Sequence, residues 1–219
     1  MIELNNVCKR YPVHRGERTI LDHISLQINP HQQLGVLGRN GAGKSTLVRL
    51  LSGAERPTSG TITRKMMVSW PIALGDAFHN ELTGLDNVRL ISRIYNIDYK
   101  NIIEFVKDFS ELGSYLREPL QRYSTGMRAR LAFAISMSVE FDCYLIDEVV
   151  SVGDSRFHEK CQIELFEKRK DRSKVIVSHD QNLVRQYCEN TVVLVDGHLH
   201  QFDTVEEGLE FYKRHMENG

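Results

Sequence analysis

The sequence lacks any apolar run long enough to cross a membrane. Its most apolar stretches, residues 66–75 and 131–139, fall well short of the roughly 18 residues that a spanning helix needs. Its first residues lack an apolar signal core, and its 4 cysteines are scattered without a C-x-x-C pair. We therefore expect a cytoplasmic protein that does not cross a membrane by itself, with cysteines that serve as packing residues.

An excess of charge of either sign is also missing, since 28 Lys and Arg residues face 29 Asp and Glu residues, for a net charge of -1. A basic field of the kind that attracts nucleic acid is therefore absent, and we expect no nucleic-acid partner. The balance that is present, 41% apolar and 26% charged among 219 residues, is typical of a globular protein with one large domain or a domain with a lobe.

The most informative stretch fits the phosphate-binding pattern G-x-x-x-x-G-K-[ST]. Its residues are Gly38, Arg39, Asn40, Gly41, Ala42, Gly43, Lys44, Ser45 and Thr46. Glycines let backbone N–H groups approach phosphate oxygens closely, Lys44 adds a positive charge, and Ser45 offers a hydroxyl to Mg²⁺. A short apolar strand at 34–37 comes before this loop, and a helix begins near Lys44 with its positive end toward the anion. This context favours a phosphate site over a glycine-rich turn that binds nothing.

Polar residues follow two further apolar runs that have the composition of buried strands. Asp147 and Glu148 end the run at 141–146, and His179 follows the run at 174–178. Adjacent carboxylates at a strand end point to opposite sides, so one can reach a metal while the other faces a water. A lone histidine in such a place is more often an ordinary polar residue. Because open α/β sheets bind ligands at the carboxyl ends of their parallel strands, we nevertheless expect one shared site there.

The remaining patterns frame these motifs. Apolar residues at 2–12 and 18–29 predict a small antiparallel lobe, where Tyr11 either stacks on a flat ring or is an ordinary interfacial tyrosine. Helical spacing from Thr83 predicts a mainly helical insertion from about 83 to 120. A helix pattern at 128–139 follows Ser124, whose Ser-Thr-Gly turn is either an anion site or a plain helix N-cap.

Two other features are not explained by phosphate chemistry. His198 and His200 fall on one face of a strand after an Asp-Gly turn, and without a third ligand in view we interpret them as surface residues. Residues 66–90 carry Trp70 and other apolar side chains among few charges. They are either a buried strand and loop or a groove for a partner's helix, with Leu85 as an exposed anchor.

Taken in order, these motifs resemble those of the ATP-binding subunits of ABC transporters, over nearly the whole chain. The motifs are the phosphate loop, Ser124-Thr125-Gly126-Met127, Asp147-Glu148, Asp154 and His179. The resemblance implies an α/β fold, with a P-loop NTPase core on a mostly parallel sheet, a small antiparallel β lobe and a helical insertion. It implies a single nucleotide-binding domain at 1–219 with a helical subdomain at about 83–140.

The resemblance also implies ATP and Mg²⁺ as ligands and gives each residue a role. Tyr11 would stack on adenine, while Lys44 and the loop amides would bind phosphates. Ser45 and Asp147 would hold Mg²⁺, and Glu148 would polarise the attacking water.

Further roles follow from the same resemblance. His179 would contact the γ-phosphate, and Asp154 would belong to a loop that crosses a dimer. Two chains would form a homodimer in the ATP-bound state, in which Ser124, Thr125, Gly126 and Met127 bind the nucleotide held by the other subunit.

Two departures from the general pattern resemble the polysaccharide-export branch of that family. The signature begins Tyr-Ser-Thr-Gly-Met instead of Leu-Ser-Gly-Gly-Gln, and His79 stands where glutamine is usual, which makes it a third candidate catalytic residue. Ser69-Trp70-Pro71 and the sequence Asp-Glu-Val-Val-Ser-Val-Gly-Asp at 147–154 point the same way. Within that branch, the chain is most similar to the ATP-binding subunits of capsular polysaccharide exporters.

The function that this implies is ATP hydrolysis coupled to export of a lipid-linked capsular polysaccharide through a separate transmembrane permease subunit. The chain would lie at the cytoplasmic face of the inner membrane. The alternatives left open are the ATP-binding subunit of an O-antigen or teichoic acid exporter, that of an importer, and a non-transport ABC ATPase. A phosphate-loop kinase would leave Ser124, Gly126 and His179 unexplained.

Overall fold

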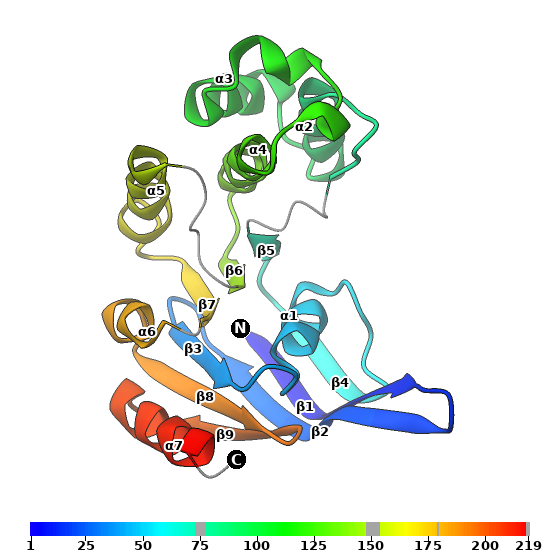
Figure 1. The fold of residues 1–219 in the computed structure, drawn as a ribbon, viewed down its shortest axis with the longest axis vertical. Coiled ribbons are helices and arrows are strands. Elements are labelled where there is room, and N and C mark those ends of the chain that lie inside the picture. The colour runs from blue at the N-terminus through cyan, green and yellow to red at the C-terminus, as the bar shows by residue number, and fades with distance from the viewer. Residues whose placement is uncertain (73–77, 148–153, 179, 218–219) are drawn as a thin grey trace. The chain divides into compact units, whose positions relative to one another are not determined.

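The computed structural model describes residues 1–72, 78–147, 154–178 and 180–217 (Figure 1). The chain divides into two compact units. The first comprises Met1–Pro71, Phe141–Glu148 and Asp171–Gly219, and the second comprises Ile72–Glu140 and Val149–Lys170. Among the helices of the described residues, none has both the length and the apolar character that a bilayer-spanning segment requires.

The antiparallel lobe of the first unit is a sheet with the strand order β2-β1-β4. Its strands are β1 (Ile2–Pro12), β2 (Glu17–Ile28) and β4 (Ser59–Arg64). Apolar residues alternate along β2, so Ile24, Leu26 and Ile28 are buried on one face while their neighbours are exposed. The lobe predicted from the sequence is confirmed, and β4 is its third strand.

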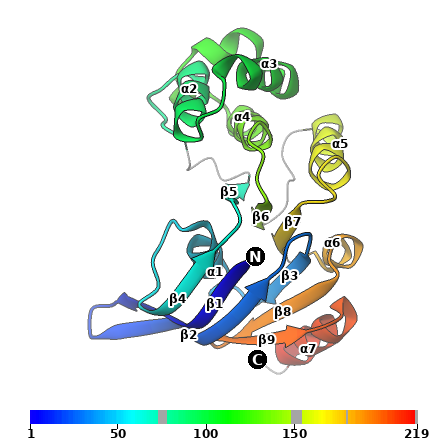
Figure 2. The same cartoon turned by 180° about the vertical axis from the view of Figure 1, so that it is seen from behind.

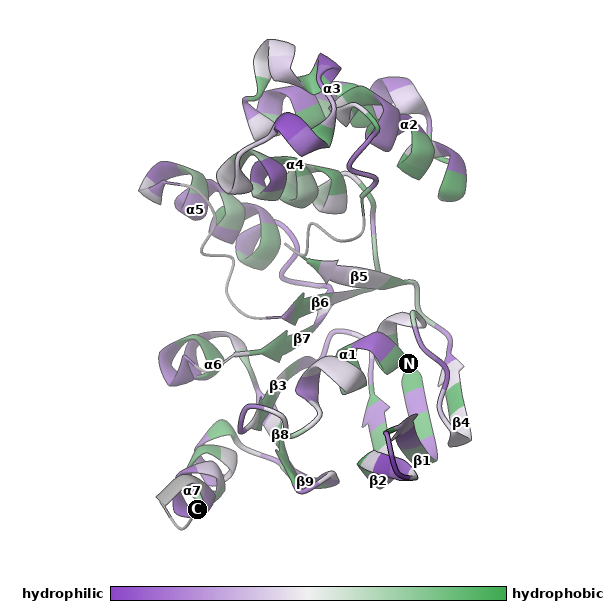
Figure 3. Ribbon diagram, turned by 45° about the vertical axis from the view of Figure 1, so that its right-hand side comes forward, coloured by the Kyte–Doolittle hydropathy of each residue, from purple (hydrophilic) through white to green (hydrophobic). Residues whose placement is uncertain are grey.

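The larger sheet has the strand order β5-β6-β7-β3-β8-β9. Its strands are β3 (Gln33–Gly38), β5 (Val68–Ile72), β6 (Cys143–Asp147), β7 (Ser173–Val177), β8 (Asn190–Val195) and β9 (His198–Phe202). Neighbours from β6 to β8 are parallel, and β9 is antiparallel to β8. Every residue of β7 is buried, in keeping with the apolar character of β6 and β7 in Figure 3. The α/β fold with a mostly parallel sheet is confirmed.

Helices cover both faces of this sheet, as Figures 1 and 2 show. Helix α1 (Lys44–Ser52) packs between it and the lobe, in a core that includes Leu4, Leu26, Leu47 and Val175. On the other face, α6 (Gln181–Tyr187) and α7 (Val205–Glu217) enclose a second apolar cluster around Val193. The phosphate loop therefore begins on a strand that is supported from both sides.

The second unit is helical. Its elements are α2 (Gly84–Ile94), α3 (Tyr99–Ser110), the short 3₁₀ helices η2 (Gly113–Arg117) and η3 (Leu120–Arg122), α4 (Thr125–Met137), α5 (Ser155–Gln162) and the π-helical turn η4 (Ile163–Glu167). Thr83 caps α2, accepting the N–H of Asp86 at 3.1 Å, at the residue from which the sequence predicts helical spacing. Phe109, Phe133 and Phe157 pack together at the centre of this unit.

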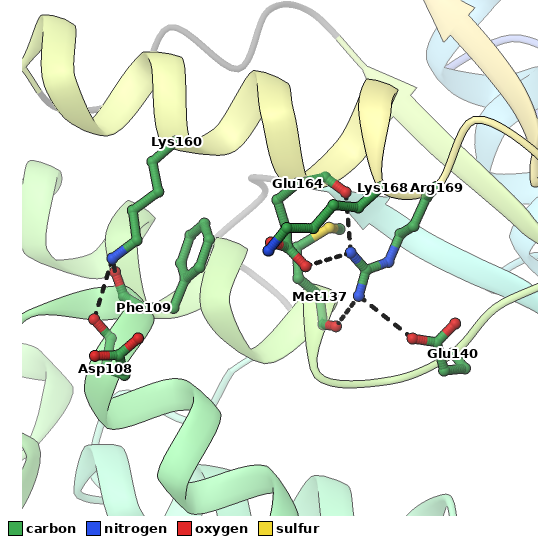
Figure 4. Close-up of polar contacts among 8 residues, drawn as sticks. All are labelled: Asp108, Phe109, Met137, Glu140, Lys160, Glu164, Lys168 and Arg169. Carbon is green, nitrogen blue, oxygen red and sulfur yellow. Dashed lines mark hydrogen bonds and ion pairs between the residues drawn. The ribbon is translucent and has the colours of Figure 1, made fainter.

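Two basic side chains tie the helical segments of this unit together (Figure 4). The Lys160 ammonium donates to the carbonyls of Asp108 and Phe109 at the end of α3, at 3.1 Å each. The Arg169 guanidinium donates to the carbonyl of Met137 at 2.6 Å and to the carboxylate of Glu164 at 2.5 Å. Both lysine and arginine thus satisfy carbonyls at helix C-termini, which have no partner inside the helix.

The Arg169–Glu164 ion pair is buried, with side-chain exposures of 8% and 6%. Burial alone would raise the pKa of Glu164, but hydrogen bonds from Lys168 and Arg169 outweigh it and hold that pKa below its usual value. Glu164 is therefore a buried carboxylate whose charge depends on its two partners.

We expect Arg169→Ala to lower the free energy of unfolding by about 3–5 kcal/mol, because it leaves the Glu164 charge buried with only part of its compensation. Arg172→Ala is the matched control, since Arg172 pairs with Asp142 at 3.4 Å across exposed side chains and such pairs contribute about 0–1 kcal/mol. Thermal and urea unfolding of both variants measure the difference. Equal destabilisation of the two would contradict the importance of the buried pair.

Candidate nucleotide-binding site

The phosphate loop depends on a glycine at the start of α1. Gly43 is the N-cap residue of that helix, and its φ of 106° lies in the left-handed region. A Cβ atom there would come within 2.9 Å of the Leu21 side chain and 3.2 Å of the Ile20 carbonyl. Strand β2 therefore lies directly behind the loop, and both the backbone conformation and the close approach of β2 require glycine.

The rest of the loop combines a buried lysine with exposed positions. Lys44 is buried, and its ammonium donates to the carbonyls of Gly38 at 2.8 Å and Arg39 at 3.1 Å, which holds the loop in a closed turn. Gly41 and Ser45 are exposed, and a Cβ atom on Gly41 would meet no atom within 4 Å. With exposed backbone at Gly41 and no acidic residue in the first turn of α1, the positive end of this helix suits a phosphate.

Asp147 lies at the same edge of the sheet as the loop. It is the last residue of β6 and pairs in parallel register with Val177 of β7, which in turn pairs with Val36 of β3. The half-buried Asp147 carboxylate and the exposed Ser45 hydroxyl are oxygen donors of the kind that Mg²⁺ prefers. The other two residues predicted for this edge, Glu148 and His179, lie outside the described residues.

Tyr11 is held by polar contacts at the end of β1. Its hydroxyl donates to Glu55 at 2.5 Å, and the Lys9 ammonium lies 2.9 Å from the same carboxylate and 4.9 Å from the Tyr11 ring centroid. The Tyr11 hydrogen bond, helped by Lys9 and Arg49, lowers the pKa of Glu55 despite some burial. The half-buried ring therefore has a fixed orientation at the edge of the lobe, which sequence patterns alone do not specify.

In the second unit, the Ser-Thr-Gly motif forms the start of α4. Ser124 is the N-cap residue and its hydroxyl accepts the N–H of Met127 at 3.2 Å, so the helix begins before the predicted 128. Thr125 and Gly126 follow in the first turn, where no residue is acidic. Gly126 is exposed and a Cβ atom on it would meet open space. Of the two alternatives for this turn, the structure shows the helix N-cap formed by Ser124. The exposed helix end also has room for an anion, so the N-cap does not exclude an anion site.

Asp154 is tied to the same helix by a residue that the sequence analysis missed. As N-cap of α5, it accepts the N–H of Phe157 at 2.9 Å, and its other oxygen accepts from the Arg130 guanidinium of α4 at 2.8 Å. The Phe157 hydrogen bond and the Arg130 charge lower the pKa of Asp154. Arg130 also lies 4.6 Å from the Phe157 ring centroid. In the sequence Arg130 looks like any helical surface charge, so nothing there indicates this role.

His79 is positioned through its backbone. The fully buried Asn87 side chain accepts the His79 N–H at 3.0 Å and donates to the His79 carbonyl at 3.2 Å. The residue as a whole remains exposed, so its imidazole is available to a ligand. Asn87 is a second functional residue that the sequence analysis missed, because only tertiary structure distinguishes a buried asparagine from an exposed one.

The structure bears on the two interpretations of residues 66–90, a buried strand and loop or a groove for a partner's helix, and it corrects the expected exposure of Leu85. Ile72 and Phe78 are buried, and Trp70 packs edge-on against Phe141 with ring centroids 5.2 Å apart, so these residues serve the core. Leu85 is half-buried rather than exposed, and it lines a pocket of about 500 Å³ together with Ile103. Residues 73–77 of this segment lie outside the described residues.

With this geometry established, comparison with known proteins decides the family. A family model described as "ABC transporter" matches residues 21–151, which is more than half of the chain. The chain belongs to the ABC transporter family. The matched region of this ABC protein contains the phosphate loop and Asp147 of the first unit. It also contains the Ser124 motif of the second unit.

Its relatives match it over nearly their whole length. It is 56% identical over 97% of its chain to the ATP-binding protein BexA of Haemophilus influenzae and to the capsule polysaccharide export ATP-binding protein CtrD of Neisseria meningitidis serogroup B, covering 98% of each. It is 38% identical over 99% of its chain to the polysialic acid transport ATP-binding protein KpsT of Escherichia coli, covering 98% of that protein. The similarity to these ATP-binding proteins therefore extends over nearly the whole of this chain.

Solved structures share its fold. A dimeric structure of the ATP-binding cassette MJ0796 in a post-hydrolysis state with ADP and Pi matches with a TM-score of 0.78, at 22% identity, over 94% of this chain and 99% of that one. A dimeric structure of MJ0796, a bacterial ABC transporter cassette, matches with a TM-score of 0.76 at 23% identity, with the same coverage. These likenesses establish the ABC cassette fold.

If the Tyr11 ring stacks on the nucleotide base, Tyr11→Ala weakens ATP binding about 10-fold, since base–aromatic stacking contributes roughly 1–3 kcal/mol. Tyr11→Phe keeps the ring and loses the hydrogen bond to Glu55, so its affinity stays within about 3-fold of wild type. Fluorescence titration with a labelled ATP analogue measures both. Equal losses in the two variants would mean that the Glu55 contact, and not stacking, decides affinity.

Proposed function

We propose that this chain is the ATP-hydrolysing subunit of an ABC exporter that moves a lipid-linked capsular polysaccharide across the inner membrane. The observation that carries the proposal is the 56% identity to CtrD, over 97% of this chain and 98% of that protein. Relatives named for O-antigen export are 33% and 36% identical, and relatives named for teichoic acid export are 32% and 33% identical. That gap favours a capsular substrate over the other exported glycans.

At the phosphate loop, we propose that the loop amides and Lys44 bind the phosphates of ATP while Tyr11 stacks on the base. The exposed Ser45 hydroxyl and the Asp147 carboxylate would hold Mg²⁺, which supplies charge neutralisation at the phosphates when it is bound. The proposed nucleotide-binding loop also includes its remaining residues, which are Gly38, Arg39, Asn40, Gly41, Ala42, Gly43 and Thr46.

For hydrolysis, we propose that Glu148 orients and deprotonates the attacking water and that His179 contacts the γ-phosphate. His79 would take part from the second unit, where Asn87 fixes its backbone and leaves the residue exposed. An imidazole can donate or accept one hydrogen bond at each nitrogen, so it can orient a water as a glutamine amide does.

For the ATP-bound state, we propose a homodimer in which Ser124, Thr125, Gly126 and Met127 of one chain bind the nucleotide held by the other. The N-terminus of α4 supports this role, because Gly126 is exposed there, no residue of the first turn is acidic and the positive end of a helix favours an anion. Asp154 would belong to the loop at the dimer contact, where Arg130 couples it to the same helix.

A separate transmembrane permease subunit completes the proposed exporter, and this chain would bind it at the cytoplasmic face of the inner membrane. The support is that relatives of this chain are named as ATP-binding proteins of capsule polysaccharide export or polysialic acid transport. ATP-driven closing and opening of the dimer would then be transmitted to that permease.

The dimer proposal is tested at Gly126. We expect Gly126→Asp to fold normally, because a Cβ atom there meets no neighbour within 4 Å. Its carboxylate would repel the partner's γ-phosphate, so ATP binding stays intact while ATP-dependent dimerisation is lost. Size-exclusion chromatography with ATP measures this, with Glu148→Gln in all samples to slow hydrolysis.

Asn101→Asp is the matched control, since it adds the same negative charge at an exposed position of α3. The control should dimerise like the parent protein. A stable dimer of the Gly126→Asp variant would contradict binding of the partner's nucleotide at this helix.

The export function is tested in a strain that lacks this protein. We expect no surface capsule, full recovery with the wild-type gene, and no recovery with Lys44→Ala, because the loop then loses the charge that binds phosphates. Flow cytometry with an anti-capsule antibody measures the result, and immunoblotting confirms equal protein levels. Normal capsule in the deletion strain would overturn the proposal.

A further inference from the structure

A mixed cluster of metal-binding side chains lies in the lobe, where the pairing of β1 and β2 is irregular. Val7 pairs with Ile24 and Lys9 pairs with Leu21, so Cys8 alone lies opposite both Asp22 and His23. Adjacent residues of a regular strand point to opposite faces, but a bulge of this kind turns two consecutive side chains toward one position. The irregularity therefore brings three different donor groups together.

The three donor atoms are close enough to share one ion. The Cys8 sulfur, a carboxylate oxygen of Asp22 and a ring nitrogen of His23 all lie within 4.8 Å of one another. The Cys8 sulfur is 3.8 Å from Asp22 Oδ1, and His23 Nδ1 is 2.7 Å from the same oxygen. Tetrahedral zinc with bonds of about 2.0–2.3 Å needs donors roughly 3.3–3.8 Å apart, which small side-chain rotations reach from this arrangement.

We propose that Cys8, Asp22 and His23 form a zinc-binding site. Sulfur, nitrogen and oxygen donors together suit Zn²⁺, whereas Mg²⁺ and Ca²⁺ prefer oxygen alone. Cys8 is fully buried, Asp22 is half-buried and His23 is exposed, so the ion has a protected inner side and an outer side that solvent reaches. A water on the outer side supplies the fourth ligand.

The surroundings keep these donors in place. The Cys8 sulfur accepts the backbone N–H of His23 at 3.2 Å, and the Asp22 N–H donates to the Gly197 carbonyl at 2.9 Å, from the turn between β8 and β9. His23 has a left-handed φ of 49°, which is uncommon outside glycine. These contacts hold the three donor groups at one position of the irregular pairing.

The site is distinct from the proposed magnesium site, which uses oxygen donors at the edge of the larger sheet. It lies on the strand that supports the phosphate loop, since the neighbouring residues Ile20 and Leu21 contact Gly43. Zinc at this position would cross-link β1 and β2 behind that loop.

Titration of the metal-free protein with Zn²⁺ alone, in the absence of nucleotide, tests the proposal. We expect one tightly bound ion per chain and a higher Tm with zinc, because an ion that binds only the folded state stabilises it. Co²⁺ in place of zinc should give a sulfur-to-cobalt charge-transfer band, which reports a thiolate ligand. No binding at micromolar zinc, or no such band, would overturn the site.

Variants identify the ligands. His23→Ala removes an exposed side chain and should fold, and we expect its zinc affinity to fall by at least about 10-fold. Cys8→Ser should abolish the cobalt band. Cys188→Ser and His200→Ala are the matched controls and should behave like wild type. Unchanged zinc affinity in His23→Ala would overturn the proposal even if the buried Cys8→Ser variant failed to fold.

Discussion

Much of the first unit supports the conformation of one loop, which must present its backbone to solvent at Gly41 to receive a phosphate. A loop with left-handed backbone positions does not keep this conformation by itself, so the surrounding structure has to hold it open. Gly43 does so in a left-handed conformation against Leu21, and Lys44 closes the turn through the carbonyls of Gly38 and Arg39. The buried strand β3 before the loop and the lobe behind it are the rigid supports of this arrangement.

Features set by neighbouring residues could be predicted from the sequence. Buried strands show as continuous apolar runs, and the helix start at Thr83 follows from a side-chain cap that acts within three residues. The phosphate loop is recognisable because its glycines and lysine act through local backbone geometry. The position of Asp147 beside the loop was also predictable, because the carboxyl ends of parallel strands meet at one edge.

Contacts between distant segments could not be predicted in this way. Arg130 contacts Asp154 and Asn87 holds His79, but in the sequence both look like ordinary polar positions of a helix. Leu85 was expected to be exposed, and only the packing of α2 against its neighbours makes it half-buried. Cys8 joins Asp22 and His23 because the register of β1 and β2 slips by one residue, and strict alternation gives no signal of a bulge.

Each unit holds its candidate residues by contacts of its own. Leu21 supports Gly43 within the first unit, while in the second Arg130 fixes Asp154 and Asn87 fixes His79. Groups that are fixed before binding lose little conformational entropy when a ligand arrives, so more of the interaction energy appears as affinity. In the proposed dimer, ATP would therefore join two preformed surfaces. Its γ-phosphate, the part that hydrolysis removes, is then the natural determinant of whether those surfaces stay together.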